Sequence, residues 1–159
     1  MLSEPALRPA TKADVPTLAR LLLELGYDTE PLELGRRVDM VLAHSDHFLR
    51  LAIDADHDVL GAVHASLHFD LTNGAFVEIS ALIVSGAARR LGVGRVLVRG
   101  VESWAAQRGS YRVLVRSQTH RESAFAFYRE LGYVPSKTQH VLVREPRELR
   151  PSGPTTLAD

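Results

Sequence analysis

Residues 82–95 read LIVSGAARRLGVGR, and this stretch decides the fold. It begins with the apolar end of a strand, and the apolar residues from Val93 onward recur at helical spacing. Gly92 and Gly94, at the junction, allow backbone conformations and close approaches that other residues resist. Free N–H groups at a helix start bind anions, and nearby arginines add positive charge. The stretch predicts a phosphate or pyrophosphate site, although a glycine turn with solvated arginines fits these residues equally well.

Two better-known nucleotide loops do not fit this stretch. A Walker A loop ends in Gly-Lys-Ser/Thr, whereas Gly94 is followed by Arg95. A dinucleotide-binding loop needs a third glycine where Leu97 stands, and it usually follows the first strand of a βαβ unit. The loop here follows a run of antiparallel strands instead.

Working outward, the hydrophobic period predicts helices and strands on both sides of the loop. Before it we expect a short strand, two helices and three strands, at 7–10, 11–26, 31–42, 48–53, 59–69 and 76–84. After it we expect a helix, a central strand, a helix and two more strands, at 93–109, 113–115, 122–131, 133–134 and 139–143. This order indicates a mixed α and β fold, with a mixed sheet covered by helices.

Composition narrows the class of protein. A length of 159 residues fits one domain, which we place at 1–145, followed by a flexible tail at 146–159. Lys plus Arg equals Asp plus Glu at 19 each, so we do not expect nucleic acid as a partner. No apolar run approaches the roughly 20 residues that span a bilayer, so no membrane partner is expected either. The chain has no cysteine, which excludes disulfides, thiolate metal sites and a thiol nucleophile. The start of the chain does not look like a secretory signal, so a cytoplasmic protein is expected.

Two motifs together resemble the GNAT superfamily of acetyl-CoA-dependent N-acetyltransferases. The family's cofactor loop, Gln/Arg-x-x-Gly-x-Gly/Ala, is matched by residues 89–94, RRLGVG, after a strand ending in Leu82-Ile83-Val84. A second signature, Ala-x-x-Phe-Tyr-x-x-x-Gly-Phe/Tyr, is matched by residues 124–133, AFAFYRELGY. With the opening at Leu7, the resemblance covers roughly residues 6 to 144.

The resemblance implies an α+β, GNAT-like fold whose central sheet has a splayed central strand pair and about four flanking helices. It implies acetyl-CoA as the acetyl donor and no metal. The implied cofactor-binding residues are the strand end, the loop and one further arginine: Leu82, Ile83, Val84, Arg89, Arg90, Leu91, Gly92, Val93, Gly94, Arg95 and Arg121. Arg121 is a departure, because many members have asparagine there.

For the chemistry, the resemblance implies that Tyr128 protonates the departing thiolate and that Glu78 is a candidate general base. Tyr128 also fits a core aromatic, and Glu78 also fits a solvated or ion-paired strand residue. Without a cysteine, direct attack of the amine in a ternary complex is expected rather than an acyl-enzyme.

The histidines have simpler interpretations. His44, His47 and His57 look like surface or loop residues, whereas His64 and His68 share one face of a strand and could mark the acceptor side of the cleft. They lack a third ligand at suitable spacing for a metal.

The sequence thus predicts an N-acetyltransferase acting on a primary amine, with a small-molecule acceptor. A peptide or protein amine, and a non-catalytic acyl-CoA-binding or regulatory module, are the alternatives. Family members often dimerise, so a homodimer is expected. A polycationic acceptor such as an aminoglycoside would need an acidic cleft, for which the candidate residues are Asp28, Glu30, Glu33 and Asp70.

Overall fold

A computed structural model describes residues 4–145, so the predicted tail at 146–159 lies outside the described residues. The chain divides into two compact units, the first ending at Glu122 and the second beginning at Ser123. Within residues 4–145, no helix combines the length and apolar character that a membrane crossing needs.

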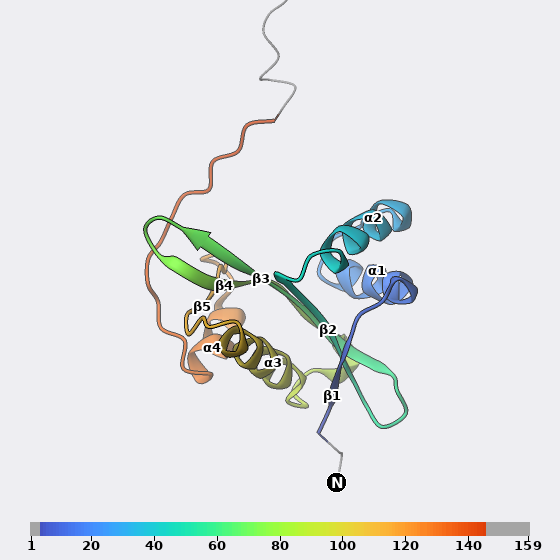
Figure 1. Cartoon of the computed structure of the whole chain (residues 1–159). Helices are drawn as coiled ribbons and strands as arrows, with labels where there is room; N and C mark the ends of the chain where they lie inside the picture. The colour runs from blue at the N-terminus through green and yellow to red at the C-terminus, as the bar shows by residue number, and fades with distance from the viewer. Residues whose placement is uncertain (1–3, 146–159) are drawn as a thin grey trace, which may run out of the picture. The chain divides into compact units, whose positions relative to one another are not determined.

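The first unit is built on a five-stranded sheet with the strands in chain order (Figure 1). Its strands are β1 (Ala6–Pro9), β2 (His47–Ile53), β3 (Val59–Asp70), β4 (Gly74–Val84) and β5 (Val113–Val115). The first four pair antiparallel, and β5 runs parallel to β4. The mixed sheet confirms the predicted fold class. However, β5 lies at the edge of this sheet rather than in its centre, because no further strand pairs with it in the described chain.

Helices cover both faces of the sheet (Figure 1). On one face, α1 (Val15–Glu24) and α2 (Pro31–Leu42) bury Leu18, Leu21, Leu34 and Val38 against Leu49, Leu51, Ala62 and Ile83 of the strands. On the other face lies α3 (Val93–Gln107), where Trp104 packs against Phe48 with ring centroids 5.3 Å apart. Successive side chains of a strand point to opposite faces, which is why Phe48 packs against α3 whereas its neighbour Leu49 packs beneath α1 and α2.

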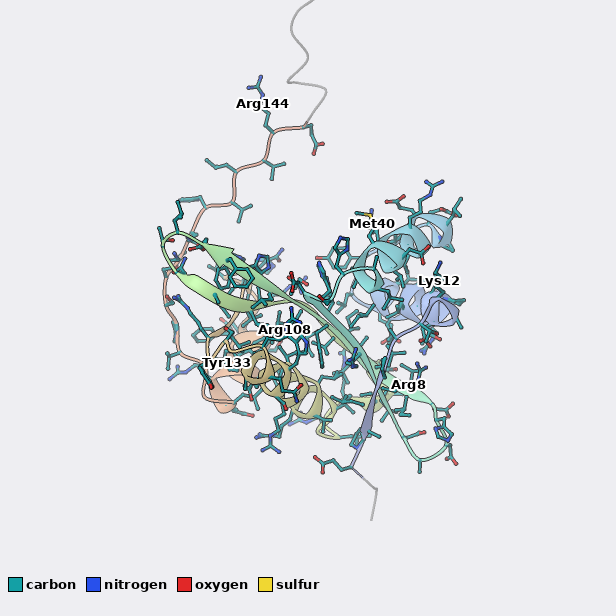
Figure 2. All side chains as sticks on the ribbon, in the orientation of Figure 1. Arg8, Lys12, Met40, Arg108, Tyr133 and Arg144 are labelled. Carbon is teal, nitrogen blue, oxygen red and sulfur yellow. The ribbon has the colours of Figure 1, made fainter. Side chains whose placement is uncertain are left out.

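A glycine in the middle of α3 lets this helix approach the sheet closely. A Cβ added at Gly100 would lie 2.4 Å from Cδ1 of Leu7 in β1 and 3.6 Å from the ring of Phe48. At the end of α3, Arg108, labelled in Figure 2, forms an ion pair with Asp46, which directly precedes β2. The lack of a side chain at Gly100 thus allows α3 to pack closely on the sheet, and the ion pair of Arg108 with Asp46 stabilises this packing.

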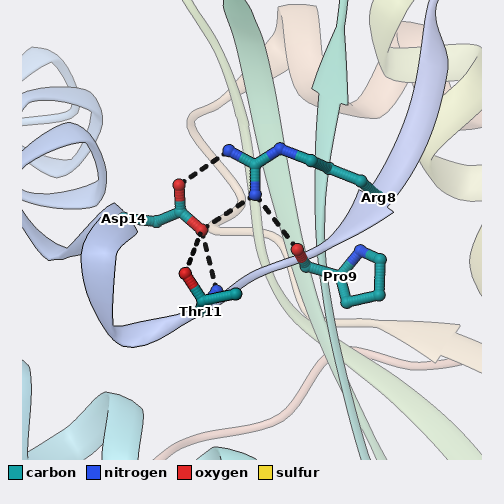
Figure 3. A network of polar contacts seen from close by, with 4 residues as sticks. All are labelled: Arg8, Pro9, Thr11 and Asp14. Atoms are coloured by element: carbon teal, nitrogen blue, oxygen red, sulfur yellow. Dashed lines mark hydrogen bonds and ion pairs between the residues drawn. The ribbon is translucent and has the colours of Figure 1, made fainter. Parts of the chain in front are cut away.

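The turn after β1 is stabilised by a buried carboxylate (Figure 3). Arg8 donates to both oxygens of Asp14 at 2.9 and 2.7 Å, and the backbone N–H of Thr11 donates to Asp14 at 2.7 Å. These contacts tie β1 to Asp14, the last residue of the short 3₁₀ helix η1 (Lys12–Asp14) that precedes α1. The hydrogen bonds from Arg8 hold the pKa of Asp14 below its usual value.

Asp14→Asn is expected to lower the free energy of unfolding by about 2 kcal/mol, since hydrogen bonds to charged groups each contribute about 1.5–3 kcal/mol. Because folding lowers the pKa of Asp14, its stabilisation is present above the ordinary aspartate pKa of about 3.9 and is lost as the pH falls through the lower folded-state value. Urea denaturation at neutral and acidic pH measures both effects.

The matched control is Asp39→Asn, which breaks the exposed ion pair between Lys12 and Asp39. Exposed pairs contribute little, so this variant should unfold close to wild type. Equal losses in the two variants would contradict the importance of the Asp14 network.

The second unit begins within α4 (Glu122–Glu130), the helix predicted at 122–131. The strands predicted at 133–134 and 139–143 are not formed, and this prediction was wrong. Val141, Leu142 and Val143 are 79%, 91% and 79% exposed. Their β-propensity is high, but a strand also needs a neighbouring edge with which to pair, and none pairs with this segment in the described chain.

Candidate active site

The second half of β4 has an open edge. β5 pairs with β4 only from Val77 to Ile79 and then ends at Val115, whereas β4 continues to Val84. On the other edge, β3 remains paired with β4 as far as Val84. In the described chain, therefore, no strand partners the backbone groups of residues 80–84 that point away from β3. An extended ligand can hydrogen-bond there as an added strand, and the predicted residues Leu82, Ile83 and Val84 lie on this segment.

A β-bulge in the pairing of β3 with β4 lies where β5 separates from β4. Ala65 of β3 is opposite Ile79, but the next residue back, His64, is opposite Ala81, which leaves Ser80 as the extra residue. The bulge changes side-chain parity, so Glu78 and Ile83 face the same side although they are five residues apart. Ile83 packs in the core beneath α1 and α2, so Glu78 lies on the same face of the sheet as these two helices.

The glycine loop leads from this strand into α3. After the short 3₁₀ helix η2 (Gly86–Ala88), Arg90 has a φ of 65° and Gly92 a φ of 78°, both in the left-handed region. Such conformations are costly for arginine and typical of functional loops. Gly92 is the residue that caps α3, and it has no side chain to accept from the first N–H groups of the helix.

The predicted loop residues divide between backbone and surface positions. Val93 and Gly94 are buried in the first turn of α3, whereas the side chains of Arg89, Arg90, Leu91 and Arg95 are exposed. The arrangement suits an anion, because helix-start N–H groups and the helix dipole act together with nearby arginines. Arg121, the last residue before α4, is exposed, and its backbone N–H donates to Gln118 at 3.0 Å.

Glu78 has a cation as partner. Its side chain is 18% exposed, and its Oε1 accepts from Nε of Arg116 at 2.8 Å. Arg116 directly follows β5, so the ion pair spans the two strands at the place where they separate. The structure thus shows Glu78 as an ion-paired strand residue, and its part in catalysis stays a prediction.

Three histidines and two serines occupy the same face as Glu78. His47 of β2 is opposite Ser66 of β3, and Ser66 is opposite Glu78 of β4. His64 of β3 lies between His47 and Ser80. Its Nε2 is 2.9 Å from Nδ1 of His47, and its Nδ1 is 2.9 Å from Oγ of Ser80. Separately, Oγ of Ser66 lies 2.8 Å from Nε2 of His68.

Sequence reasoning missed three members of this group, His47, Ser66 and Ser80. His47 was expected to be a surface or loop residue, but it is half-buried and begins β2, and the structure corrects that prediction. Ser80 was not singled out, because only the bulge gives it its position. The alternation of apolar residues after His47 is a signal that could have extended the strand by one residue. The expectation that His64 and His68 share a face is confirmed, since they lie four residues apart on β3 and the extra residue of the bulge lies on β4.

The acidic residues suggested for a polycation are mostly engaged within their own segments. Glu30 accepts from the backbone of Glu33 at the start of α2, and Glu33 pairs with Arg37 at 3.1 Å. Asp70 accepts from Thr72 and Asn73 in the turn after β3, and these hydrogen bonds lower its pKa to about 2. Each of these three carboxylates thus has hydrogen-bond partners within its own segment.

Tyr128 belongs to the second unit and is buried in it as part of α4. Its ring makes edge contacts with Phe127 and Tyr133, at centroid distances of 5.0 and 5.5 Å. Burial raises the pKa of Tyr128 to about 12. The phenol therefore stays protonated at neutral pH, as a proton donor must.

In the part of the chain that the structure describes, no three His, Asp or Glu side chains are grouped to hold a metal ion.

Comparison with known proteins identifies the family. Residues 16–133 match the acetyltransferase (GNAT) family model, a match that extends across both units. An aminoglycoside N(6')-acetyltransferase type 1 from Stenotrophomonas maltophilia is 30% identical over 138 residues, covering 82% of this chain and 87% of that protein. An enzyme of the same name from Acinetobacter haemolyticus is 27% identical over 131 residues, covering 80% and 89%.

The fold agrees with this match. The crystal structure of an aminoglycoside antibiotic 6'-N-acetyltransferase from Acinetobacter haemolyticus superposes with a TM-score of 0.78 at 22% identity, covering 88% of this chain and 98% of that one. The resemblance inferred from the two motifs is therefore confirmed. The chain belongs to the GNAT family of acetyltransferases, which use acetyl-CoA as the donor, and it is an N-acetyltransferase.

Proposed function

We propose that this enzyme transfers the acetyl group of acetyl-CoA to a primary amine of a small molecule, by direct attack in a ternary complex. The observation that supports this most is the continuity of the open β4 edge with the glycine loop. A pantetheine arm laid along residues 82–84 would pair with the open strand edge while its pyrophosphate meets the start of α3. The residues of the open edge and the loop are the proposed cofactor contacts.

The proposed reaction needs three groups around the thioester. The amine must lose a proton before it attacks, because an alkyl ammonium has a pKa of about 10. The carbonyl oxygen then gains negative charge, for which a backbone N–H of the open edge, at Val84 or its neighbour, is the proposed donor. The thiolate finally takes a proton, for which Tyr128 is the proposed donor.

The acceptor is proposed to be an amine of the aminoglycoside class. Two relatives of similar length act on aminoglycosides by their names, at 30% and 27% identity. The test measures thiol release from acetyl-CoA with two matched aminoglycosides, one with a 6'-amine and one with a 6'-hydroxyl. Turnover of the amine alone supports the proposal. Turnover of peptide amines instead, with both aminoglycosides inert, would overturn this acceptor class.

Glu78→Gln is expected to lower kcat/KM for the amine by about 100-fold at pH 7. Two roles are open to the carboxylate, and steady-state kinetics separates them. As a general base, Glu78 would contribute to kcat, and the loss in Glu78→Gln would shrink as the pH approaches the amine's pKa of about 10. As the anion that binds the ammonium, it would contribute to KM, with kcat unchanged.

The control for this substitution is Asp56→Asn, the same change of acid to amide in the exposed turn between β2 and β3. It should retain wild-type kinetics. If Glu78→Gln does so too, neither role is correct, and the ion pair with Arg116 is only structural.

We also propose that residues 1–145 form one acetyltransferase domain that works in the cytoplasm, where acetyl-CoA is available, as a homodimer. The family match across both units supports the single domain. Sedimentation equilibrium tests the oligomeric state, and a monomer at all concentrations would overturn the dimer.

A further inference from the structure

Three side chains from three adjacent strands form one hydrogen-bonded chain at the bulge. Ser80 comes from β4, His64 from β3 and His47 from β2, and each link of the chain is 2.9 Å long. The chain begins at the residue that the bulge displaces, where β4 and β5 separate. It ends at the half-buried His47, beside the exposed His44, whose ring centroid is 6.2 Å away. It thus links the exposed Ser80, beside the open edge of β4, with a second position near the surface at His47.

The Ser80 hydroxyl has two acceptors within reach. Its Oγ lies 2.9 Å from Nδ1 of His64 and 3.2 Å from the backbone oxygen of His64. With the proton directed at Nδ1, His64 carries its own proton on Nε2 and donates it to Nδ1 of His47. With the proton directed at the backbone oxygen, the direction of both imidazole hydrogen bonds reverses. A chain with two such states can pass a proton from one end to the other.

His64 is held neutral between its two partners. Burial, and then the neighbouring His47, lower the pKa of His64 to about 4. The other charged or titratable groups on this face are His44 after α2, His68 on β3, and Glu78 with its partner Arg116. Asp46, which precedes His47, is paired with Arg108. A neutral ring between two polar partners can transfer a proton without retaining the charge.

We propose that Ser80, His64 and His47 form a proton relay that removes the proton from the acceptor amine, an inference that rests on the proposed acetyl transfer. One N–H bond of the ammonium breaks as an O–H bond forms on Ser80, whose own proton moves to Nδ1 of His64. The Nε2 proton of His64 moves to Nδ1 of His47. The amine becomes neutral and His47 becomes an imidazolium, which releases a proton to solvent. Charge and protons balance without a co-reactant.

The relay defines the roles of the polar residues on this face. Ser80 is the catalytic member, because it touches the amine, and the two histidines act through it. Imidazole has an ordinary pKa of about 6.5, which lies closer to neutral pH than that of a carboxylate, so it is the better proton acceptor there. Glu78 is then the anion that binds the ammonium beside the relay.

The test compares His64→Gln with His57→Gln, the same substitution in the exposed turn between β2 and β3. Glutamine keeps hydrogen-bonding groups but does not relay protons. We expect His64→Gln to lower kcat by about 100-fold at pH 7, with the KM for acetyl-CoA unchanged. The loss should disappear as the pH approaches about 10, where the amine is already neutral. His57→Gln should follow the wild-type pH profile, and Ser80→Ala should follow His64→Gln.

A second readout is independent of turnover. Nitrogen NMR of the imidazoles should show His64 neutral from pH 7 down to about 4, with a tautomer that changes in Ser80→Ala. Thermal unfolding checks that each variant is folded. If wild type acetylates the amine and His64→Gln has the same pH profile as wild type, the relay is overturned, whereas the proposed acetyl transfer stands. No turnover of any amine by wild type overturns the proposed acceptor chemistry and the relay with it.

Discussion

Tyr128→Phe is expected to lower kcat for acetyl transfer by about 100-fold, because it removes the proposed proton donor to the departing thiolate. Burial raises the pKa of Tyr128 to about 12, so the hydroxyl is protonated throughout the range in which the enzyme is assayed. A phenol needs to be protonated to act as the acid, and activity limited by this group would fall only above that value. Phenylalanine keeps the ring contacts with Phe127 and Tyr133, so folding should be preserved.

The control is Tyr111→Phe, since this tyrosine is 90% exposed and loses the same hydroxyl. Steady-state kinetics with saturating acetyl-CoA should show wild-type kcat for this control and an unchanged KM for acetyl-CoA in both variants. Wild-type kcat in Tyr128→Phe would mean that the phenol is a core group and that the thiolate leaves unprotonated.

Gly92→Asp is expected to weaken acetyl-CoA binding by about 100-fold, or roughly 2.7 kcal/mol. The substitution places a carboxylate where the first N–H groups of α3 would meet the pyrophosphate. Two like charges about 4 Å apart repel by about 4 kcal/mol at an effective dielectric constant near 20, enough for this loss. Isothermal titration calorimetry with acetyl-CoA measures the change directly.

The chain offers a closely matched control at the other end of the same helix. Gly109 has a φ of 77°, against 78° for Gly92, and an added Cβ meets no atom within 4 Å at either site. Gly109→Asp therefore introduces the same strain, about 1–2 kcal/mol for a left-handed residue, without a charge in the loop. Equal affinities for acetyl-CoA in the two variants would show that the pyrophosphate is not bound at the start of α3.

The features that follow from local sequence were predicted correctly. Helical spacing and the glycines around it located α3, and the run of β-forming residues from Phe76 located β4. The change from strand to helix at the Gly92 loop was also predicted from consecutive residues, whereas the part of this loop in binding acetyl-CoA stays a prediction. Periodicity and glycine placement depend on the chain's own neighbours, so one sequence is enough to read them.

The features that depend on partners across the sheet were not predictable in the same way. Ser80 has its position only because β3 and β4 pair with a bulge, and His47 meets His64 only because β2 and β3 pair in that register. The segment 139–143 has the composition of a strand but is unpaired in the first unit's sheet, as pairing depends on a neighbour rather than on propensity. The ion pair of Glu78 likewise depends on where β5 ends.

The most direct test of the central claim is to quantify both products of one reaction. Purified enzyme is incubated with acetyl-CoA and a 6'-amino aminoglycoside, and mass spectrometry and thiol titration follow the amine and the released coenzyme A. Acetyl transfer to a small-molecule amine predicts one acetylated amine for each thiol released, with both products reduced together in Gly92→Asp at subsaturating acetyl-CoA. Tight binding of acetyl-CoA without acetylation of this or any other amine would contradict the claim and would identify the chain as an acyl-CoA-binding module.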